Sequence, residues 1–157
     1  MRLNLGSYLY PIKGWHNVDI EKWDGVDEVV DLNRLPWPWS TGAFEEVGAI
    51  DIVEHLGKLT KVEIVEELAR VTSPGGRVVV RVPCASHAWA LASLQHAHAF
   101  QYNSFEESYA QPWFKCVSVR VGLSDYGKRS FGLNRFWRVI CKYFHVVQVL
   151  EFELVKK

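Results

Sequence analysis

Residues 68–83 read Leu-Ala-Arg-Val-Thr-Ser-Pro-Gly-Gly-Arg-Val-Val-Val-Arg-Val-Pro. Pro74 cannot continue a helix, and Gly75 and Gly76 give the backbone the freedom that a tight reversal needs. The valines at 78–80 follow without alternation, which is typical of a strand covered on both faces. This stretch therefore predicts the end of a helix, a turn and a buried strand of an α/β sheet.

A capped helix is predicted immediately before this turn. Thr60 can accept a hydrogen bond from the backbone, and Glu63 stands three residues later, which is the spacing of a capping box. The apolar residues that then share one helical face are Val62, Val65, Leu68 and Ala69. Strands are predicted at 2–5, 17–20, 27–31, 46–51, 77–82, 116–122 and 145–155, a helix at 133–143, and a helix or loop at 86–110. The pattern favours an α/β fold with a mostly parallel sheet.

The connections between the first three predicted strands are unusually short. Residues 6–16 and 21–26 separate them, whereas a parallel crossover normally takes a dozen residues or more and usually contains a helix. We therefore expect shortened or missing crossover helices and a bare sheet face near the first three strands. Because exposed apolar faces are rarely left uncovered, the aromatic segment 131–144 or a second copy in a homodimer is expected to cover it.

Length and composition bound the class of protein. A chain of 157 residues predicts one domain spanning 1–157. No run approaches the 18 apolar residues of a membrane span, and the N-terminus lacks the apolar segment of a signal peptide. The three cysteines are odd in number and widely spaced, which indicates reduced thiols. Together these features predict a cytoplasmic protein without a membrane partner.

The net charge of zero conceals an asymmetry along the chain. Residues 1–107 hold nine basic and fifteen acidic side chains, whereas residues 108–150 hold seven basic side chains and one acidic side chain. A basic stretch at 115–142 interleaved with aromatic residues is one signature of nucleic-acid binding. The alternative is a solvated face that balances the acidic half, and an excess of six charges is modest for a protein that binds through phosphate contacts.

Short motifs follow one another in a fixed order through residues 2–107. They are Leu3-Asn4-Leu5-Gly6-Ser7; Gly14-Trp15-His16-Asn17-Val18-Asp19-Ile20; Asp31-Leu32 with Leu35-Pro36-Trp37; Ile50-Asp51-Ile52-Val53-Glu54-His55-Leu56; Glu67-Leu68-Ala69-Arg70-Val71 through Pro74-Gly75-Gly76; and His98-Ala99-Phe100 with Ser104-Phe105. In this order and spacing they resemble the small class I S-adenosylmethionine-dependent methyltransferases of the type 11 kind. The resemblance implies a three-layer Rossmann-like fold, strand order 3-2-1-4-5-7-6 with an antiparallel last strand, and methyl transfer from S-adenosylmethionine.

The resemblance also implies which residues hold the cofactor. They are Leu5, Gly6, Ser7, Asp19, Ile20, Asp31, Leu32 and Asp51. Asp19 would bind the ribose hydroxyls, and Asp31 with the Leu32 backbone would hold the adenine edge. For three of these residues a structural role is also possible: Gly6 as a plain strand-to-loop glycine, Asp19 as a loop cap and Ile20 as core. In the family this loop has a second glycine two residues after the first, whereas this chain has Tyr8 at that position. The tyrosine side chain fills the space expected for the methionine part of the cofactor.

Histidines supply the candidate catalytic groups. His55 titrates near neutrality and can act as a general base, and Asp51 would share its helical face if a helix began there. His96 or His98 could serve as the base instead. These two histidines could also ligate a metal with His87 or Asp51 as third ligand, but without a defined third ligand no metal site is predicted.

Missing motifs narrow the function. The sequence contains neither a Gly-x-x-x-x-Gly-Lys-Ser/Thr loop nor a Gly-x-Ser-x-Gly elbow, which argues against a nucleoside triphosphatase and an α/β-hydrolase. The Asn/Asp-Pro-Pro-aromatic motif of amino-group nucleic-acid methyltransferases is also absent after the fourth strand. The favoured hypothesis is methyl transfer to an oxygen or another nitrogen of an unidentified acceptor. The alternatives are a binding protein that kept the fold and lost catalysis, and a nucleic-acid-associated protein using the stretch 115–142.

Overall fold

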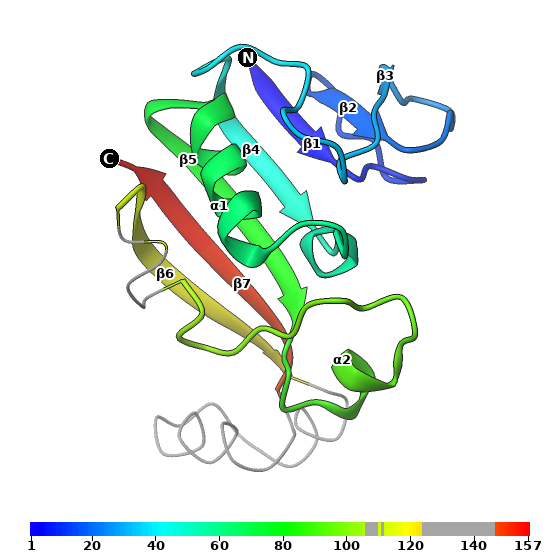
Figure 1. Cartoon of the computed structure of the whole chain (residues 1–157), viewed down its shortest axis with the longest axis vertical. Helices are drawn as coiled ribbons and strands as arrows, with labels where there is room; N and C mark the ends of the chain where they lie inside the picture. The colour runs from blue at the N-terminus through cyan, green and yellow to red at the C-terminus, as the bar shows by residue number, and fades with distance from the viewer. Residues whose placement is uncertain (106–109, 111, 124–146) are drawn as a thin grey trace.

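The computed structural model describes residues 1–105, 110, 112–123 and 147–157, and it contains a seven-stranded sheet (Figure 1). The strands are β1 (Arg2–Leu5), β2 (His16–Asp19), β3 (Glu28–Val29), β4 (Phe44–Ile50), β5 (Thr72–Pro83), β6 (Phe114–Leu123) and β7 (Val147–Lys156). Their order is β3-β2-β1-β4-β5-β7-β6, as predicted. The first five strands are parallel to one another, and β7 runs antiparallel to both β5 and β6.

Helix α1 (Lys61–Val71) confirms the predicted capping box. The Thr60 side chain accepts from the Glu63 amide at 3.2 Å, and the Glu63 carboxylate accepts from the Thr60 amide at 2.7 Å. The helix ends at Val71, and the chain then forms an irregular extension around Gly75 before it pairs regularly with β4. The buried face was predicted incorrectly in one position: Val62 is exposed, and Ile64 packs in the core with Val65 and Leu68.

The loop between β3 and β4 is fastened to α1 by a buried polar network. The Glu67 carboxylate accepts from the Trp37 amide at 2.6 Å and pairs with the Arg70 guanidinium at 2.6 Å. Arg70 also donates to the carbonyl oxygens of Trp37 and Trp39. Burial opposes ionisation of Glu67, but the hydrogen bonds from Arg70 and Trp37 outweigh it and lower the pKa of this carboxyl. The network places the Trp37 side chain, which is 2% exposed, in the core.

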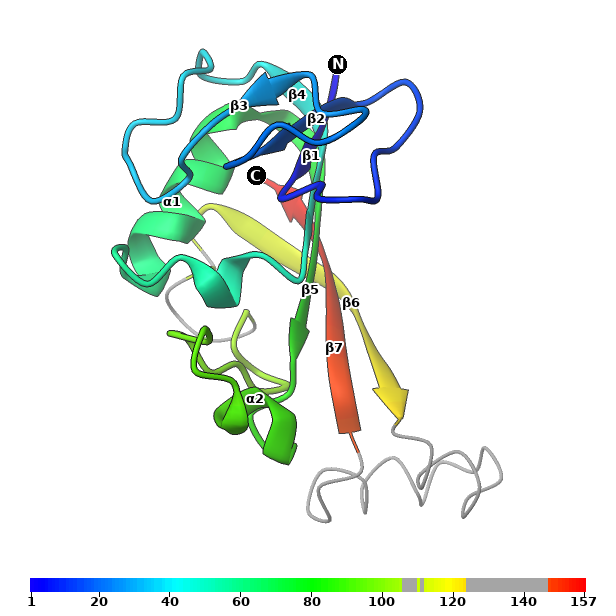
Figure 2. The same ribbon diagram turned by 90° about the vertical axis from the view of Figure 1, so that its right-hand side faces the viewer.

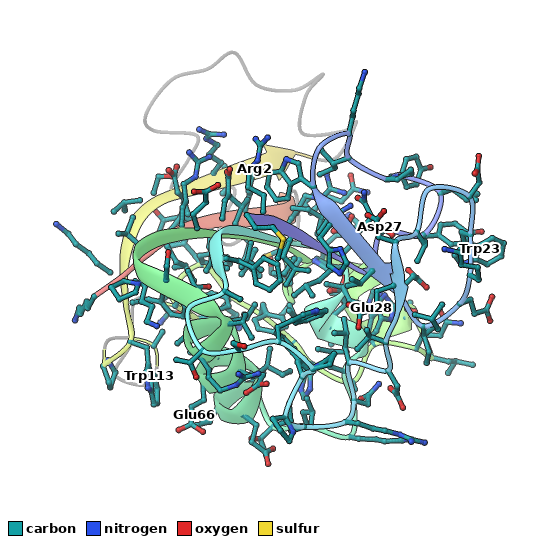
Figure 3. The ribbon with its side chains drawn as sticks, turned by 90° about the horizontal axis from the view of Figure 1, so that it is seen from above. Arg2, Trp23, Asp27, Glu28, Glu66 and Trp113 are labelled. Atoms are coloured by element: carbon teal, nitrogen blue, oxygen red, sulfur yellow. The ribbon has the colours of Figure 1, made fainter. Side chains whose placement is uncertain are left out.

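Among the described residues, helices cover one face of strand β5. Val78, Val80 and Val82 are fully buried on the side of α1, whereas Val79 and Arg81 on the opposite face are partly exposed. The prediction of a strand buried on both faces is therefore wrong. The physical reason is visible in Figure 2: α1 and α2 (Ala88–Ala92) lie on the same side of the sheet. Figure 3 shows the two faces of the sheet: Arg2 lies above it, and Glu66 of α1 lies below it.

The face opposite α1 is charged across its C-terminal half. Arg77 of β5 lies between Glu46 of β4 and Glu153 of β7, at 3.7 Å and 3.3 Å respectively. Arg120 of β6 pairs with Glu151 of β7 at 3.1 Å. A face laddered with ion pairs can remain in water, so this half of the sheet face needs no cover. The segment 131–144, proposed as that cover, and the helix predicted at 133–143 lie outside the described residues.

The N-terminal half of that face is covered by the short loop after β1. Trp15 packs over Gly48 of β4, where an added Cβ would lie 3.4 Å from its ring, and the Arg2 guanidinium sits 5.3 Å from the Trp15 ring. Below the loop, the buried Asn4 side chain donates to Asn17 Oδ1 at 2.9 Å. Residues 6–15 and 20–27 are all described and contain no helix, as the short spacing predicted.

Among the described residues, no helix is long and apolar enough to span a membrane.

Candidate functional site

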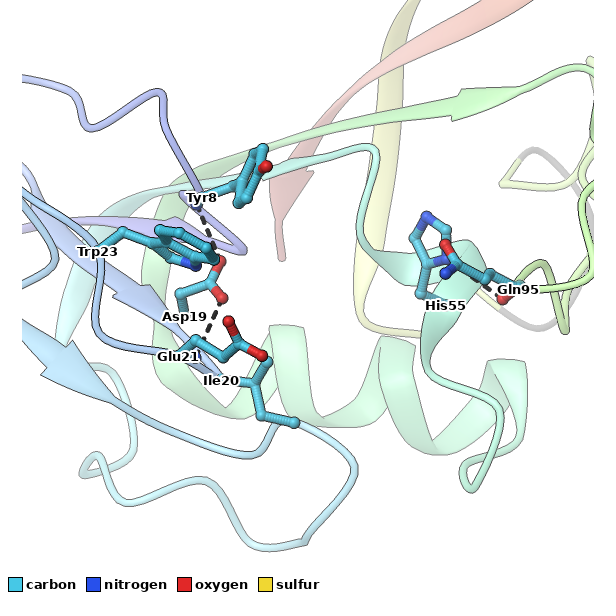
Figure 4. Close-up of a pocket in the computed structure, with 7 residues that line it drawn as sticks. All are labelled: Tyr8, Asp19, Ile20, Glu21, Trp23, His55 and Gln95. Carbon is cyan, nitrogen blue, oxygen red and sulfur yellow. Dashed lines mark hydrogen bonds between the residues drawn. The ribbon is translucent and has the colours of Figure 1, made fainter.

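A pocket opens beyond the carboxyl ends of β1, β2 and β4 (Figure 4). Its volume is about 650 Å³, within the range of small-molecule sites. The lining residues are Tyr8, Asp19, Ile20, Glu21, Trp23, His55 and Gln95. The chain leaves β1 for β2 on one side and reaches β4 on the other, so the pocket lies at the switch point where α/β folds bind ligands.

The loop after β1 begins with a glycine that the local geometry requires. Gly6 has φ of 63°, and a Cβ added there would approach the Ile52 side chain to 2.8 Å. Ser7 follows, anchored by its amide to the carbonyl oxygen of Val18 at 2.9 Å. The Ser7 hydroxyl is buried and has no hydrogen-bond partner among the described residues, although a buried polar atom normally finds one. A bound ligand is one source of that partner.

Asp19 at the end of β2 is buried at the pocket wall. Its Oδ2 accepts from the Tyr8 amide at 2.8 Å, and its Oδ1 accepts from the Glu21 amide at 3.2 Å. The loop-capping role left open by the sequence is therefore real. A carboxylate has about four acceptor sites, so these two bonds leave capacity for ligand hydroxyls. Asp19 can cap the loop and face a ligand at the same time.

Aromatic and apolar side chains flank Asp19. Tyr8 has φ of 42° and meets Trp23 edge-to-face, with ring centroids 5.0 Å apart and an interplanar angle of 82°. Ile20 is 60% exposed and lines the pocket, so it is not a core residue. These three side chains offer flat and branched surfaces against which a heteroaromatic ring can pack. Trp23 was not singled out from the sequence, because a tryptophan in a short polar loop carries no motif.

Of the predicted cofactor residues only Asp19 and Ile20 line this pocket; Gly6 and Ser7 lie in the adjoining loop, and the other four lie elsewhere. Leu5 and Leu32 are core residues, at 1% and 4% exposure. Asp31 accepts from the Asn33 amide at 3.1 Å and pairs with Arg34 at 3.1 Å. Asp51, with φ of 54°, forms a bidentate ion pair with Arg81. The ligand roles predicted for these residues stay predictions.

His55 lines the pocket on the side opposite Asp19 (Figure 4). It ends the short 3-10 helix η1 (Val53–His55), which begins after Asp51, so the condition for the two residues to share one helical face is not met. His55 Nδ1 lies 3.2 Å from the carbonyl oxygen of Gln95. Burial is the main cause that lowers the pKa of His55, which keeps the imidazole neutral at pH 7 and able to accept a proton.

Glu54 lies beside His55 and was missed from the sequence. Its side chain is 1% exposed, and burial, assisted by the charge of Asp51, raises its pKa to about 7. Its Oε1 lies 4.0 Å from His55 Nε2, and its Oε2 is buried without a hydrogen-bond partner in the part of the chain that the structure describes. The signal available was an acidic residue in an otherwise apolar turn, between Val53 and Leu56.

The histidines after β5 separate in space. His96 meets His55 edge-to-face, with ring centroids 4.9 Å apart, and its Nδ1 lies 3.0 Å from the carbonyl oxygen of Ala90. His98 Nε2 instead lies 3.0 Å from the carbonyl oxygen of Leu56. The close pair is therefore His55 with His96, from two loops, and not His96 with His98.

Comparison with known proteins connects this architecture to solved structures. No family model and no curated protein matches the sequence. A methyltransferase from Archaeoglobus fulgidus, described as SAM-dependent, superposes with a TM-score of 0.70 at 14% identity, covering 99% of this chain and 85% of that one. A second structure is geranyl diphosphate C-methyltransferase from Streptomyces coelicolor, solved with Mg²⁺, geranyl diphosphate and S-adenosyl-L-homocysteine. It superposes with a TM-score of 0.68 at 10% identity, covering 99% of this chain and 71% of that one.

A third similar structure is an enzyme of another kind. The cyclase SpnF superposes with a TM-score of 0.62 at 14% identity, covering 99% of this chain and 74% of that one. Similar architecture at such low identity establishes the fold and leaves the reaction open. The strand order, the strand directions and these superpositions all indicate the same fold. The chain has the fold of the class I S-adenosylmethionine-dependent methyltransferases.

Proposed function

We propose that this protein transfers a methyl group from S-adenosylmethionine to an oxygen or nitrogen of an acceptor. The observation that carries the proposal is the pocket at the switch point of a methyltransferase fold, with the Asp19 carboxylate on its wall. The unpartnered Ser7 hydroxyl in the loop after β1 supports a bound ligand there. The exposed Ile20 supports it too, because an apolar side chain at a pocket wall favours contact with a ring.

The cofactor would be held by residues from two loops. Asp19 would accept from the ribose hydroxyls, since charge-assisted hydrogen bonds are the stronger ones. Ile20 and Trp23 would pack against the adenine, while the backbone of Leu5, Gly6 and Ser7 would approach the methionine part. Asp31, Leu32 and Asp51 remain proposed ligands outside the pocket lining.

Bound S-adenosylmethionine supplies a methyl group that its sulfonium already activates. This chain would contribute orientation, and a proton acceptor where the nucleophile must lose a proton. His55 is the best placed base, because its neutral imidazole lines the pocket. His96 lies behind it in ring contact, and His98 is held against the carbonyl oxygen of Leu56, so both are weaker candidates for direct contact with an acceptor.

Calorimetric titration with S-adenosylhomocysteine tests the cofactor site. Asp19→Asn should weaken binding at least tenfold, because the amide replaces one acceptor oxygen with a donor. Asp27→Asn is the matched control: Asp27 also accepts a backbone N–H, from Asn17 at 2.7 Å, but does not line the pocket. No heat from the wild-type protein, or equal affinities in both variants, would contradict the proposal.

A second candidate is a binding protein that has the fold without catalysis. The observation that favours it is Tyr8, which occupies the loop position of the missing second glycine and packs into the pocket on Trp23. Its nucleic-acid form relies on the stretch 115–142, of which only 115–123 is described. There, Arg120 is already paired with Glu151. Binding of single-stranded RNA that weakens steeply with salt, without S-adenosylhomocysteine binding, would favour this candidate.

A further inference from the structure

We propose that Glu54, His55 and His96 form a binding site for a divalent transition-metal ion such as Zn²⁺. One carboxylate oxygen and one nitrogen from each imidazole lie within 4.8 Å of one another. The three residues come from two segments: Glu54 and His55 from the turn after β4, and His96 from the loop after α2. The metal would therefore join the two segments at the pocket wall that His55 lines.

The buried carboxylate of Glu54 is the first observation that points to a ligand. Its side chain is 1% exposed, and no described residue provides a hydrogen-bond partner for Oε2. A buried polar atom without a partner is costly, and buried carboxylates are usually paired or coordinate a metal. Arg81, whose charge lowers the pKa of Glu54, is engaged in the bidentate pair with Asp51. A cation bound at Glu54 would supply the missing partner.

The orientation of the two imidazoles is the second, independent observation. His55 Nδ1 lies 3.2 Å from the Gln95 carbonyl oxygen, and His96 Nδ1 lies 3.0 Å from that of Ala90. A carbonyl oxygen can only accept, so in the neutral rings each Nδ1 carries the hydrogen and each Nε2 keeps its lone pair. Metal-binding histidines are held in this way, with the other ring nitrogen donating to a carbonyl or carboxylate.

The donor set indicates the class of metal. Two imidazole nitrogens and one carboxylate oxygen suit Zn²⁺ and its transition-metal neighbours, whereas Mg²⁺ and Ca²⁺ prefer oxygen ligands. Tetrahedral Zn²⁺ with bonds of about 2.0–2.1 Å places its ligand atoms roughly 3.3 Å apart, so the three side chains must draw together by at most about 1.5 Å. Three protein ligands leave a coordination position open, as in catalytic zinc sites.

The site is separate from the cofactor pocket's acidic wall. Asp19 and the 6–8 loop lie across the pocket from His55 (Figure 4). The proposal therefore does not depend on S-adenosylmethionine binding, and metal binding can be measured without the cofactor. It does affect the choice of base, because the Nε2 lone pair of His55 cannot hold a metal and accept a proton at once.

Equilibrium dialysis of the full chain against Zn²⁺, followed by metal analysis, tests the site. We expect one Zn²⁺ per chain in the wild-type protein and an affinity about 100-fold weaker in Glu54→Gln and His96→Gln, since even outer-shell changes cost 10–100-fold. His16→Gln is the matched control, because His16 Nε2 lies 2.8 Å from a carboxylate oxygen of Glu28, in a histidine–carboxylate pair elsewhere. Its Zn²⁺ affinity should equal that of the wild-type protein.

Co²⁺ provides a second readout that does not depend on affinity alone. Visible absorption of the Co²⁺-loaded wild-type protein should show the intense bands of a low-coordinate nitrogen and oxygen site, and these bands should be lost in His96→Gln. Circular dichroism confirms that each variant is folded. Absence of stoichiometric Zn²⁺ in the wild-type protein, or equal affinity in folded Glu54→Gln and His96→Gln, would overturn the proposal.

Discussion

The amide of Tyr8 donates a hydrogen bond of 2.8 Å to Asp19 Oδ2, which joins the loop after β1 to the end of β2. This bond holds Tyr8 at φ of 42°, a left-handed conformation that L-residues other than glycine rarely adopt. The same contact thus fixes the proposed ribose ligand and directs the tyrosine ring into the pocket. We therefore expect the affinity for a cofactor bound at Asp19 and the backbone strain at Tyr8 to be coupled.

Replacing Tyr8 with glycine tests how this residue affects the stability of the protein and its affinity for the cofactor. Tyr8→Gly relieves left-handed strain of about 1–2 kcal/mol but loses the Trp23 contact of about 0.5–1.5 kcal/mol, so the free energy of unfolding should change little. Affinity for S-adenosylhomocysteine should rise severalfold, because the ring leaves the pocket. Scanning calorimetry measures the stability and titration calorimetry measures the affinity. Tyr10→Gly is the control, because Tyr10 is exposed. Weaker binding by Tyr8→Gly would show instead that the ring is part of the binding surface.

Two glycines allow backbone strain to be separated from steric overlap. Gly6 and Gly75 have φ of 63° and 72°, but an added Cβ meets Ile52 at 2.8 Å in the first case and nothing within 4 Å in the second. Gly75→Ala should therefore cost only the strain, about 1–2 kcal/mol. Gly6→Ala should cost a further 1–3 kcal/mol or so from overpacking. Urea denaturation measures the difference, and equal losses would contradict the close approach of Ile52.

The one-sided burial of β5 can be tested with adjacent valines. Val78 is fully buried beneath α1, and Val79 is partly exposed on the charged face. Val78→Ala should destabilise by about 1–3 kcal/mol, whereas Val79→Ala should cost less than about 1 kcal/mol. Chemical denaturation of both variants gives the comparison. Similar losses would indicate that both faces of the strand are covered in solution.

The Glu67–Arg70 pair predicts a pH dependence of stability. Hydrogen bonds lower the folded-state pKa of Glu67 below the ordinary value of 4.5. Its contribution is therefore fully present above that value and is lost as the pH falls through the folded-state pKa. Glu67→Gln should reduce the free energy of unfolding by about 1–3 kcal/mol at pH 7.

Thermal melts of Glu67→Gln and the wild-type protein from pH 7 down to pH 3 check the sign. The difference between the two proteins should narrow below about pH 4.5, where Glu67 becomes protonated in the unfolded chain. Glu66→Gln, one position away on the same helix, is the control for a general change in charge. A difference that stays constant down to pH 3 would show that Glu67 stabilises the loop without titrating.

Much of the fold was predictable because it depends on local rules. The capping box at Thr60, the helix end before Pro74 and the short spacings after β1 and β2 each have a direct backbone cause. The strand order required the resemblance, since valine runs alone do not say which strands are neighbours. The two-sided burial of β5 was predicted wrongly, because Val78–Val80 cannot reveal that only one face receives helices.

The candidate site was predictable in part. Asp19 and His55 were identified because they follow strand ends, where α/β sheets place their ligands. Glu54 was missed because its role depends on burial, which an isolated acidic residue in the sequence does not reveal. Asp51 was expected beside His55, but its left-handed backbone and its pair with Arg81 arise from contacts between β4 and β5 that are remote in the chain.

The two edges of the sheet differ in their capacity to recruit another strand. The β3 edge has only Glu28–Val29, and Glu28 is held by His16 and by the Trp39 indole, so it offers little backbone for pairing. The β6 edge runs over ten residues, and among the described strands only β7 pairs with it. Strand addition and aggregation of this protein should therefore begin at β6. The charged side chains of Lys115 and Arg120 oppose that outcome, because charges on an edge strand disfavour stacking of further chains.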